Sequence, residues 1–385
     1  MQFTGKKGGF AGSDYTPRFR ETRSRALTIL HSLGFGRTAM EPRIQTELDI
    51  LIGSIADHDK NGFNAFKPVI ISHFNILYKL LVGDRVDYER AIECTGSIEN
   101  TYDNNVGVLE IWGFMRFLPH LAKEAQFVMD QYGIMKQDIK DKITQHVESH
   151  TKGQTADFLH AYIDKHIDIK SDSYENDIEN LHQLTVDVLL NGVELSGRSI
   201  QWMLVLLTNY PEIQTKAHAE IGRVIGCNRT ISMDDKDSLD YIQALIWEAQ
   251  RFKPILPHGL PHYAESENTL DGFTIPKGTQ LLAISPCMYW DSNIWEEPNV
   301  FKPTRFLDSD GHFQMNPQFV PFLFGKRPCF GEGFARQILF LYTANILQNF
   351  EILPPKGFDK VEDEGHFGFT LVPKPTELQF IKRWN

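Results

Sequence analysis

The 385-residue sequence lacks features that define several common classes of protein. It has no basic excess: 39 Lys and Arg face 50 Asp and Glu, for a formal net charge of −11. Without a basic stripe to neutralise phosphates, nucleic-acid binding is not expected. The four cysteines lie far apart with no C-x-x-C pair, so cysteine spacing suggests neither a disulfide framework nor a zinc site. No internal repeat or low-complexity segment divides the chain.

The sequence also lacks a cleavable leader and any run of about 18 apolar residues, so no bilayer-spanning helix is predicted within it. Met1 leads directly into a glycine-rich polar stretch, Thr4–Ser13. Because this opening resembles neither an anchor nor a first strand, we interpret the chain as a fragment.

What the sequence does contain is mostly helical periodicity, because apolar residues recur at three- and four-residue steps through its first two thirds. The acidic segment Asp168–Asn180 is predicted to be a surface loop. After Phe252, prolines and glycines separate short β-like runs such as Gln280–Ser285, and the tail Gly368–Ile381 is predicted to be a hairpin. The fold class is therefore mostly α with a small β portion. The predicted helices are Arg18–His31, Phe35–Ala56, Pro68–Leu81, Val108–Phe117, Lys123–Glu148, Phe158–His166 and Leu181–Asn209.

One decapeptide suggests a specific chemistry. It reads Phe322-Leu-Phe-Gly325-Lys-Arg327-Pro-Cys329-Phe-Gly331 and precedes an apolar helix, Phe334–Leu347. At the mouth of a helix, Cys329 would meet the positive end of the macrodipole and free backbone N–H groups, which stabilise a thiolate. The glycines allow the backbone to approach a flat partner closely. A thiolate in such a place suits an iron centre, and a thiolate axial ligand equips haem to activate dioxygen.

Two further motifs precede this loop. Glu248 and Arg251 lie three residues apart in the predicted helix Tyr241–Phe252, on one face where they can pair. The segment Pro303-Thr-Arg305-Phe306 then lies between that helix and the cysteine loop. The order E-x-x-R, P-x-R-F and F-x-x-G-x-R-x-C-x-G resembles that of the cytochromes P-450.

The resemblance extends from about Thr16 to the C-terminus. Residues 241–263 and 272–279 look like the microsomal class that includes the family-two drug- and steroid-metabolising enzymes. The resemblance implies a cytochrome P-450 fold, with residues 1–385 forming a single catalytic domain that lacks the family's N-terminal anchor, first sheet and first helices. It also implies haem b as the cofactor.

Residue by residue, the resemblance makes Cys329 the iron ligand and places Phe322, Gly325 and Gly331 against the haem. It assigns the haem propionates to Arg327, His262 and Arg23. The sequence departs from the family pattern W-x-x-x-R at Phe19, which stands in place of tryptophan and has no indole N–H. The resemblance further implies that Glu248, Arg251 and Arg305 form a buried charge triad on the thiolate side of the haem, where such a group serves folding and haem retention.

The segment Leu190–Ser196 aligns with the distal-helix pattern A-G-x-[DE]-T-[TS], with Gly192 and Glu194 in their expected places. Leu195 stands where the family has a threonine that helps to deliver protons, and leucine has no donor or acceptor. Ser196 lies about 100° further around the helix and cannot simply substitute. Asn191 replaces the family's alanine; with Glu194 it could order a water for catalysis, hydrogen-bond a substrate, or bond to nearby backbone.

The function implied is a monooxygenase that inserts one oxygen atom of O2 into an apolar steroid-, lipid- or xenobiotic-like substrate. Electrons would come from NADPH–cytochrome P-450 reductase, with cytochrome b5 as a possible second donor, at the cytosolic face of the endoplasmic reticulum membrane. Leu195 favours a different class, a haem-thiolate isomerase or dehydratase that does not activate dioxygen, and a non-catalytic haem- or ligand-binding protein is a third class. The candidate pocket residues are Asn191, Leu195, Leu256, Leu260 and Phe369.

Overall fold

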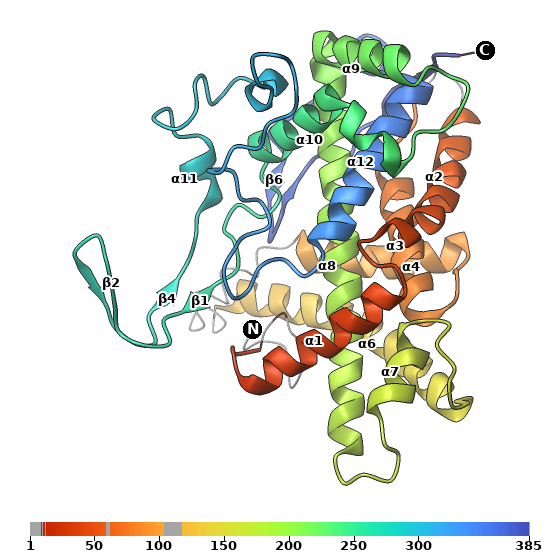
Figure 1. The fold of residues 1–385 in the computed structure, drawn as a ribbon, viewed down its shortest axis with the longest axis vertical. Helices are drawn as coiled ribbons and strands as arrows, with labels where there is room; N and C mark the ends of the chain where they lie inside the picture. Colours follow the sequence, from red (N-terminus) through yellow and green to blue (C-terminus); the bar gives the residue numbers. More distant parts are fainter. Residues whose placement is uncertain (1–8, 10, 12, 59–61, 104–117, 385) are drawn as a thin grey trace.

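The structure is a computed structural model that describes residues 9, 11, 13–58, 62–103 and 118–384. Its described part is mostly helical, as predicted (Figure 1). The predicted helix Val108–Phe117 lies outside the described residues. The main helices are α1 (Pro17–Ser32), α2 (Glu41–Ala56), α3 (Phe66–Val82), α4 (Tyr88–Tyr102), α6 (Pro119–Glu148), α7 (Phe158–His166), α8 (Tyr174–Asn209), α9 (Pro211–Val224), α10 (Asp240–Phe252), α11 (Ser285–Tyr289) and α12 (Glu332–Asn349).

Helix α8 is the axis of the molecule, and α3, α6 and α12 pack directly against it (Figure 1). Two glycines allow α3 to approach closely. A Cβ atom added to Gly192 would lie 2.5 Å from Cδ1 of Leu77, and one added to Gly197 would collide with Cδ1 of Ile70. Gly192 therefore favours the close contact between the two helices, because a larger residue would force the Leu77 side chain to move, and this role is independent of any bound group.

The start of α8 differs from the sequence-based expectation. Residues Asp168–Asn180 are predicted to be a loop, yet the helix already begins at Tyr174. The acidic residues of this segment explain the difference, because Glu175 and Asp177 occupy the first turn, where negative charge interacts favourably with the helix dipole. Charge here favours a helix start as well as a solvated surface.

Short antiparallel strand pairs make up the β portion. They are β1 (His262–Tyr263) with β4 (Gln280–Leu281), β2 (Asn268–Leu270) with β3 (Phe273–Ile275), β5 (Phe350–Leu353) with β8 (Gln379–Lys382), and β6 (His366–Phe367) with β7 (Leu371–Val372). The tail 368–381 is therefore not one hairpin, as predicted: its start pairs with β6 and its end with β5. Pro373 and Pro375 separate the two, since proline cannot donate to a strand ladder.

The predicted β-like run Gln280–Ser285 is also shorter than expected, because β4 ends at Leu281 and α11 begins at Ser285. A compact aromatic cluster, separate from the main core, packs α10 against α11 and against the segment that leads to the cysteine loop. The buried residues of this aromatic cluster are Ala244, Trp247, Tyr289, Trp295, Phe306 and Phe319.

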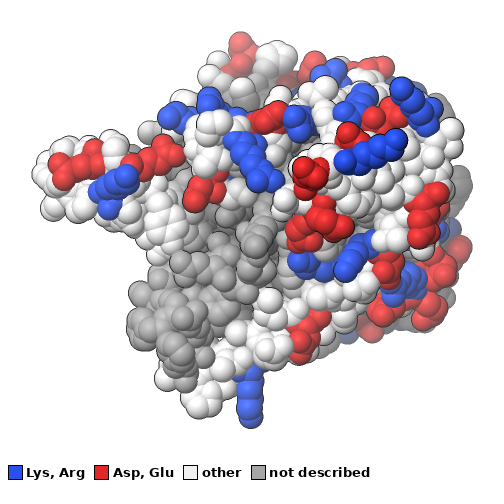
Figure 2. Space-filling model, turned by 90° about the horizontal axis from the view of Figure 1, so that it is seen from below, with Lys and Arg blue, Asp and Glu red and all other residues white. Residues whose placement is uncertain are grey.

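On the face shown in Figure 2, acidic and basic side chains are interspersed.

Candidate active site

The cysteine loop is closed by its own backbone. The backbone N–H of Cys329 donates to the carbonyl oxygen of Phe322 at 2.8 Å. Within the loop, Gly325 has φ +86° and Leu323 has φ +60°, a left-handed conformation that is unfavourable for leucine. A Cβ atom added to Gly325 would meet nothing within 4 Å, so the loop is open on that side. Gly331 is the N-cap residue of α12.

The environment of the Cys329 sulfur combines exposure with desolvation. The residue is exposed, yet burial of the thiol among surrounding protein raises its pKa above the ordinary value. Backbone N–H groups of Gly331 and Glu332 bond to the sulfur and oppose this rise, as does the charge of Arg23. The backbone N–H groups at the helix mouth thus stabilise the thiolate, as predicted, but burial has the larger effect on the pKa of Cys329. A bound metal ion would reverse this balance, because a coordinating thiol is deprotonated.

Two neighbouring arginines, one from α1 and one from the loop itself, lie in this region. Arg23 projects from α1, donates from Nη2 to the carbonyl oxygen of Pro328 at 2.8 Å, and stacks 5.5 Å from the ring centroid of Phe330. The guanidinium of Arg327 lies 4.4 Å from the ring centroid of Phe19. Burial lowers the pKa of both arginines, which nevertheless remain charged at neutral pH. Two partly desolvated cations that lie near each other, one of them close to the sulfur, form a place where carboxylate groups of a ligand would bind strongly.

Phe19, which stands in place of the expected tryptophan, supports the guanidinium of Arg327, a role that the sequence did not reveal. Its ring retains the face on which Arg327 rests, although it offers no N–H donor. The third predicted propionate ligand, His262, lies on β1 opposite Leu281, and its side chain is exposed.

Arg336 is a further residue that motif reasoning missed. Its guanidinium lies between two rings, 4.7 Å from the centroid of Trp247 on α10 and 5.0 Å from that of Phe322 in the cysteine loop. Its Nη2 also lies 2.8 Å from a carboxylate oxygen of Glu332, one turn earlier on α12. Arg336 therefore ties the first residue of the loop motif to the helix that carries the E-x-x-R sequence.

The three residues of the predicted triad come together around one carboxylate. Glu248 accepts from Nε and Nη2 of Arg251 at 2.7 and 2.8 Å, and from Nε of Arg305 at 3.0 Å. Glu248 and Arg251 are 0% exposed. The backbone N–H of Lys302 adds a further bond to Glu248 at 2.8 Å, and Arg251 also donates to the carbonyl oxygen of Tyr289 at 2.7 Å. One carboxylate thus serves two guanidiniums, and backbone carbonyl oxygens accept the remaining N–H groups of Arg251 and Arg305, so each buried charge has hydrogen-bond partners.

On the distal helix, Glu194 belongs to a network of charges. Its Oε1 accepts from Nε of Arg198 at 2.8 Å, and Arg198 donates in turn to Asp103 at 2.7 Å. Glu99 lies 3.8 Å from Arg198 and is also paired with Lys67. Three carboxylates thus share two cations, so one negative charge remains uncompensated. Accordingly, burial raises the pKa of Glu194 to about 7, despite the opposing effect of Arg198.

Asn191 makes the local backbone contact that was one of its predicted alternatives. Its side-chain N–H donates to the carbonyl oxygen of Asp187 at 2.6 Å, and its Oδ1 accepts from the hydroxyl of Tyr102 at 3.0 Å. The Tyr102 ring meets Phe369 edge-on, with centroids 5.6 Å apart, and the Tyr102 carbonyl accepts from the N–H of Phe369 at 2.8 Å. This chain of contacts joins α4, α8 and the segment between β6 and β7.

The apolar pocket candidates share intermediate exposure, which distinguishes them from the fully buried core. Ser285 donates to the carbonyl oxygen of Leu256 at 3.1 Å, and Ser199 donates to that of Leu195 at 2.8 Å. Neither contact involves the side chain of the leucine, so both leucine side chains remain available. The residues of intermediate exposure are Leu195, Leu256, Leu260 and Phe369.

Comparison with known proteins identifies the family. The sequence model of the family described as "Cytochrome P450" matches residues 2–380. Cytochrome P450 2H1 of Gallus gallus is 33% identical over 370 residues, covering 95% of this chain and 75% of the relative. Cytochrome P450 2U1 of Homo sapiens is 31% identical over 389 residues (98% and 71%), and cytochrome P450 2E1 of Oryctolagus cuniculus is 31% identical over 376 residues (95% and 76%).

The chain therefore belongs to the cytochrome P-450 family. It is an oxidoreductase of the haem-thiolate monooxygenase type, its cofactor is haem b, and its relatives are members of family two. The loop fits that cofactor, since it has an exposed cysteine whose sulfur receives two backbone N–H groups, an open glycine in the same loop and the guanidinium of Arg23 nearby. Across the described residues, no helix combines the length and apolar character needed to cross a membrane.

Proposed function

We propose that this protein inserts one oxygen atom of O2 into an apolar substrate at a haem held by Cys329, using electrons from a reductase. The observation that carries the proposal is the sulfur of Cys329, which is accessible, receives two backbone N–H groups and has Arg23 beside it. When bound, haem b supplies the activation of dioxygen. The protein supplies the axial ligand, the cations around it, the shape of the pocket and the path for protons.

On the thiolate side, Arg23 and Arg327 hold the haem propionates, with His262 as the third donor from β1. Phe322, Gly325 and Gly331 form the surface on which the ring rests. Glu248, Arg251 and Arg305 keep the approach to the loop rigid and take no part in the reaction. Their side chains are engaged with one another and with backbone groups.

On the distal side, Glu194 is the proton carrier. A carboxyl with a pKa of about 7 exchanges protons readily at neutral pH, which is the range in which proton transfer is most effective. Asn191, fixed by Tyr102 and by the Asp187 carbonyl, retains one N–H and one lone pair with which to order a water beside Glu194. This relay replaces the hydroxyl that Leu195 lacks.

The substrate is apolar, since the side chains offered to the pocket are Leu195, Leu256, Leu260 and Phe369. A steroid, a lipid or a xenobiotic of similar polarity satisfies this chemistry. By resemblance to the family, NADPH–cytochrome P-450 reductase is the electron donor, cytochrome b5 is a second donor, and the site of action is the cytosolic face of the endoplasmic reticulum membrane.

Leu195 favours one competing reaction, in which a haem-thiolate isomerase or dehydratase rearranges an already oxygenated substrate. Such an enzyme needs no proton delivery to dioxygen, so leucine at this position would carry no penalty. Oxygen uptake coupled to NADPH oxidation separates the two reactions. Product formed from a hydroperoxide without reductase would favour the rearranging enzyme.

The axial ligand is tested by Cys329→Ala in the haem-loaded protein. We expect the wild type, reduced under carbon monoxide, to show the red-shifted absorption band that gives the family its name, and the variant to lose it. Cys287→Ala is the matched control, because Cys287 is an exposed free cysteine outside the loop. Persistence of the band in Cys329→Ala would refute the assignment.

A further inference from the structure

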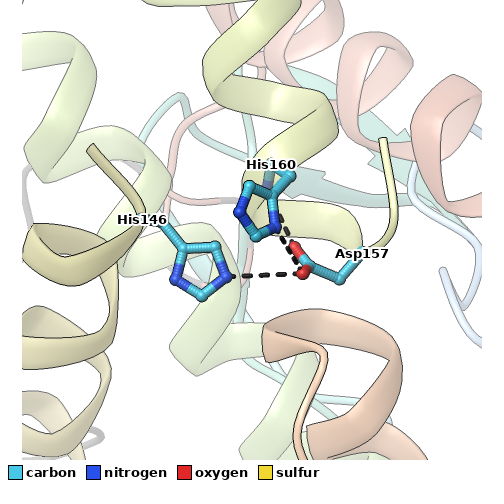
Figure 3. Close-up of side chains that lie close together, drawn as sticks. All are labelled: His146, Asp157 and His160. Carbon is cyan, nitrogen blue, oxygen red and sulfur yellow. Dashed lines mark hydrogen bonds and ion pairs between the residues drawn. The ribbon is translucent and has the colours of Figure 1, made fainter. Parts of the chain in front are cut away.

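A second group of metal-ligating side chains lies on elements that the proposed reaction does not use. His146 comes from the last turn of α6, Asp157 is the N-cap residue of α7, and His160 lies in the first turn of α7 (Figure 3). Their side chains are 9%, 2% and 13% exposed, respectively. The group therefore sits just beneath the surface, where the two helices meet.

The orientation of His146 is fixed from outside the group. Its Nδ1 lies 2.7 Å from the carbonyl oxygen of Lys142, and because a carbonyl only accepts, Nδ1 carries a proton. In the neutral imidazole, Nε2 then presents a lone pair. That atom points at Oδ2 of Asp157, 3.4 Å away: the protonated ring donates a hydrogen bond to the carboxylate, whereas the neutral ring can share a cation with it.

Asp157 is held with one oxygen turned toward both imidazoles. Its Oδ1 accepts from the backbone N–H of His160 at 2.8 Å, which leaves Oδ2 to face Nδ1 of His160 at 2.6 Å and Nε2 of His146. The two imidazole rings lie 4.2 Å apart, with 49° between their planes. Two imidazoles thus converge on a single carboxylate oxygen.

The surroundings are shaped to permit this convergence. Gly83, which ends α3, has φ +88°, and a Cβ atom there would lie 2.7 Å from Oδ2 of Asp157. Only glycine fits at this position. The ammonium of Lys142, which would otherwise repel a bound cation, lies 3.0 Å from Oδ2 of Asp84 and is compensated by it.

We propose that Nε2 of His146, Oδ2 of Asp157 and Nδ1 of His160 bind a zinc ion, with water as the fourth ligand. The three atoms all lie within 4.8 Å of one another. Zinc takes nitrogen and oxygen ligands at about 2.0–2.2 Å in a tetrahedron, which places those ligands roughly 3.3 Å apart. The distance from His146 to Asp157 already matches this spacing, while the contact between Asp157 and His160 must open slightly.

Bonds outside the first coordination shell are also in place. The Nδ1–H of His146 donates to the Lys142 carbonyl, and Oδ1 of Asp157 accepts from the backbone of His160, as outer-shell partners of metal ligands commonly do. The ion would clamp the end of α6 to the start of α7. This role is independent of the haem chemistry proposed above.

The test is equilibrium dialysis of the haem-loaded protein against Zn2+ alone, with metal counted by mass spectrometry and its ligands determined by X-ray absorption. We expect one zinc per chain, ligated by nitrogen and oxygen without sulfur. His160→Ala should weaken binding at least about tenfold. The matched control is His120→Ala, because His120 is an exposed histidine on α6 that pairs with Glu124 away from the group.

Thermal melts and haem content establish that each variant folds. If His160→Ala fails that check, His146→Gln removes another ligand and replaces it in the test. Equal zinc affinity in the wild type and the ligand variant would overturn the proposal, and so would zinc bound through sulfur at Cys227 or Cys287. Absence of binding at micromolar free Zn2+ would overturn it too, leaving a hydrogen-bonded His–Asp–His group with no metal.

Discussion

Replacing Glu194 with glutamine should remove a pH dependence from the stability of the protein. The Glu194 carboxyl is 0% exposed. Its Oε1 accepts from Arg198, while its Oε2 has no hydrogen-bond partner among the described residues. A carboxyl in this position is costly to ionise, because burial penalises the charged form and Arg198 is shared with Asp103.

The sign of the effect follows from the direction of the pKa shift. The pKa of Glu194 rises from 4.5 to about 7 on folding, so between these values the native state binds more protons than the unfolded state. The contribution of Glu194 to the free energy of unfolding therefore falls as the pH rises from 4.5 to about 7 and is constant on either side. At about 1.4 kcal/mol per pH unit, the loss amounts to about 3 kcal/mol.

Urea denaturation of the haem-loaded protein, followed at several pH values from 5 to 8, measures this loss. The variant Glu194→Gln has no titrating group, so its stability relative to the wild type should improve by about 3 kcal/mol across the range. Glu175→Gln is the matched control, since Glu175 is exposed in the first turn of the same helix. A wild-type-to-variant difference that stays constant with pH would mean that Arg198 keeps Glu194 ionised throughout, which would refute the reasoning.

Three other changes test the packing and the chemistry. Leu195→Thr should raise the product formed per NADPH and lower peroxide release, because it restores a hydroxyl to the distal helix. If the wild type is already tightly coupled and loses coupling on this change, the water relay is contradicted. Arg251→Leu should cost about 3–5 kcal/mol in urea denaturation, because Glu248 loses two buried hydrogen bonds; a loss below 1 kcal/mol would contradict the triad. Gly192→Ala should cost about 1–3 kcal/mol through overpacking against α3, whereas Gly222→Ala, in a helix and with nothing within 4 Å, should not destabilise.

The sequence predicted the bounds of helices well where a capping residue lies next to the apolar repeat. Helix α7 has the bounds expected from periodicity, and Asp157 caps it by accepting from the N–H of His160. The bounds of α8 could not be found in this way, because its first turns are polar. The strand pairing of the tail was likewise hidden, since β8 pairs with β5 across the chain and no local pattern specifies that partner.

The candidate site divides in the same manner. Cys329, Glu248 and Arg251 stand in motifs defined by the spacing of residues along the chain, so the sequence alone identifies them. The sequence does not identify Tyr102, Arg336 and Thr370, because each of them contacts a site residue that is far away along the chain. The group of His146, Asp157 and His160 has no cysteine and no recognised spacing, and only the meeting of α6 and α7 reveals it.

The leucine at position 195 and the raised pKa of Glu194 bear on the same step, the delivery of protons. Leu195 lacks the hydroxyl that the family uses, so we propose that the proton for dioxygen comes from Glu194 on the same helix. Glu194 becomes suitable for that role because Arg198 must serve Asp103 as well, which leaves a carboxyl that holds its proton near neutral pH. Thr370, whose hydroxyl lies 3.4 Å from Glu194, connects this carboxyl to the segment that carries Phe369. We infer that the network of Arg198 with its carboxylates, rather than one hydroxyl, sets proton supply in this enzyme.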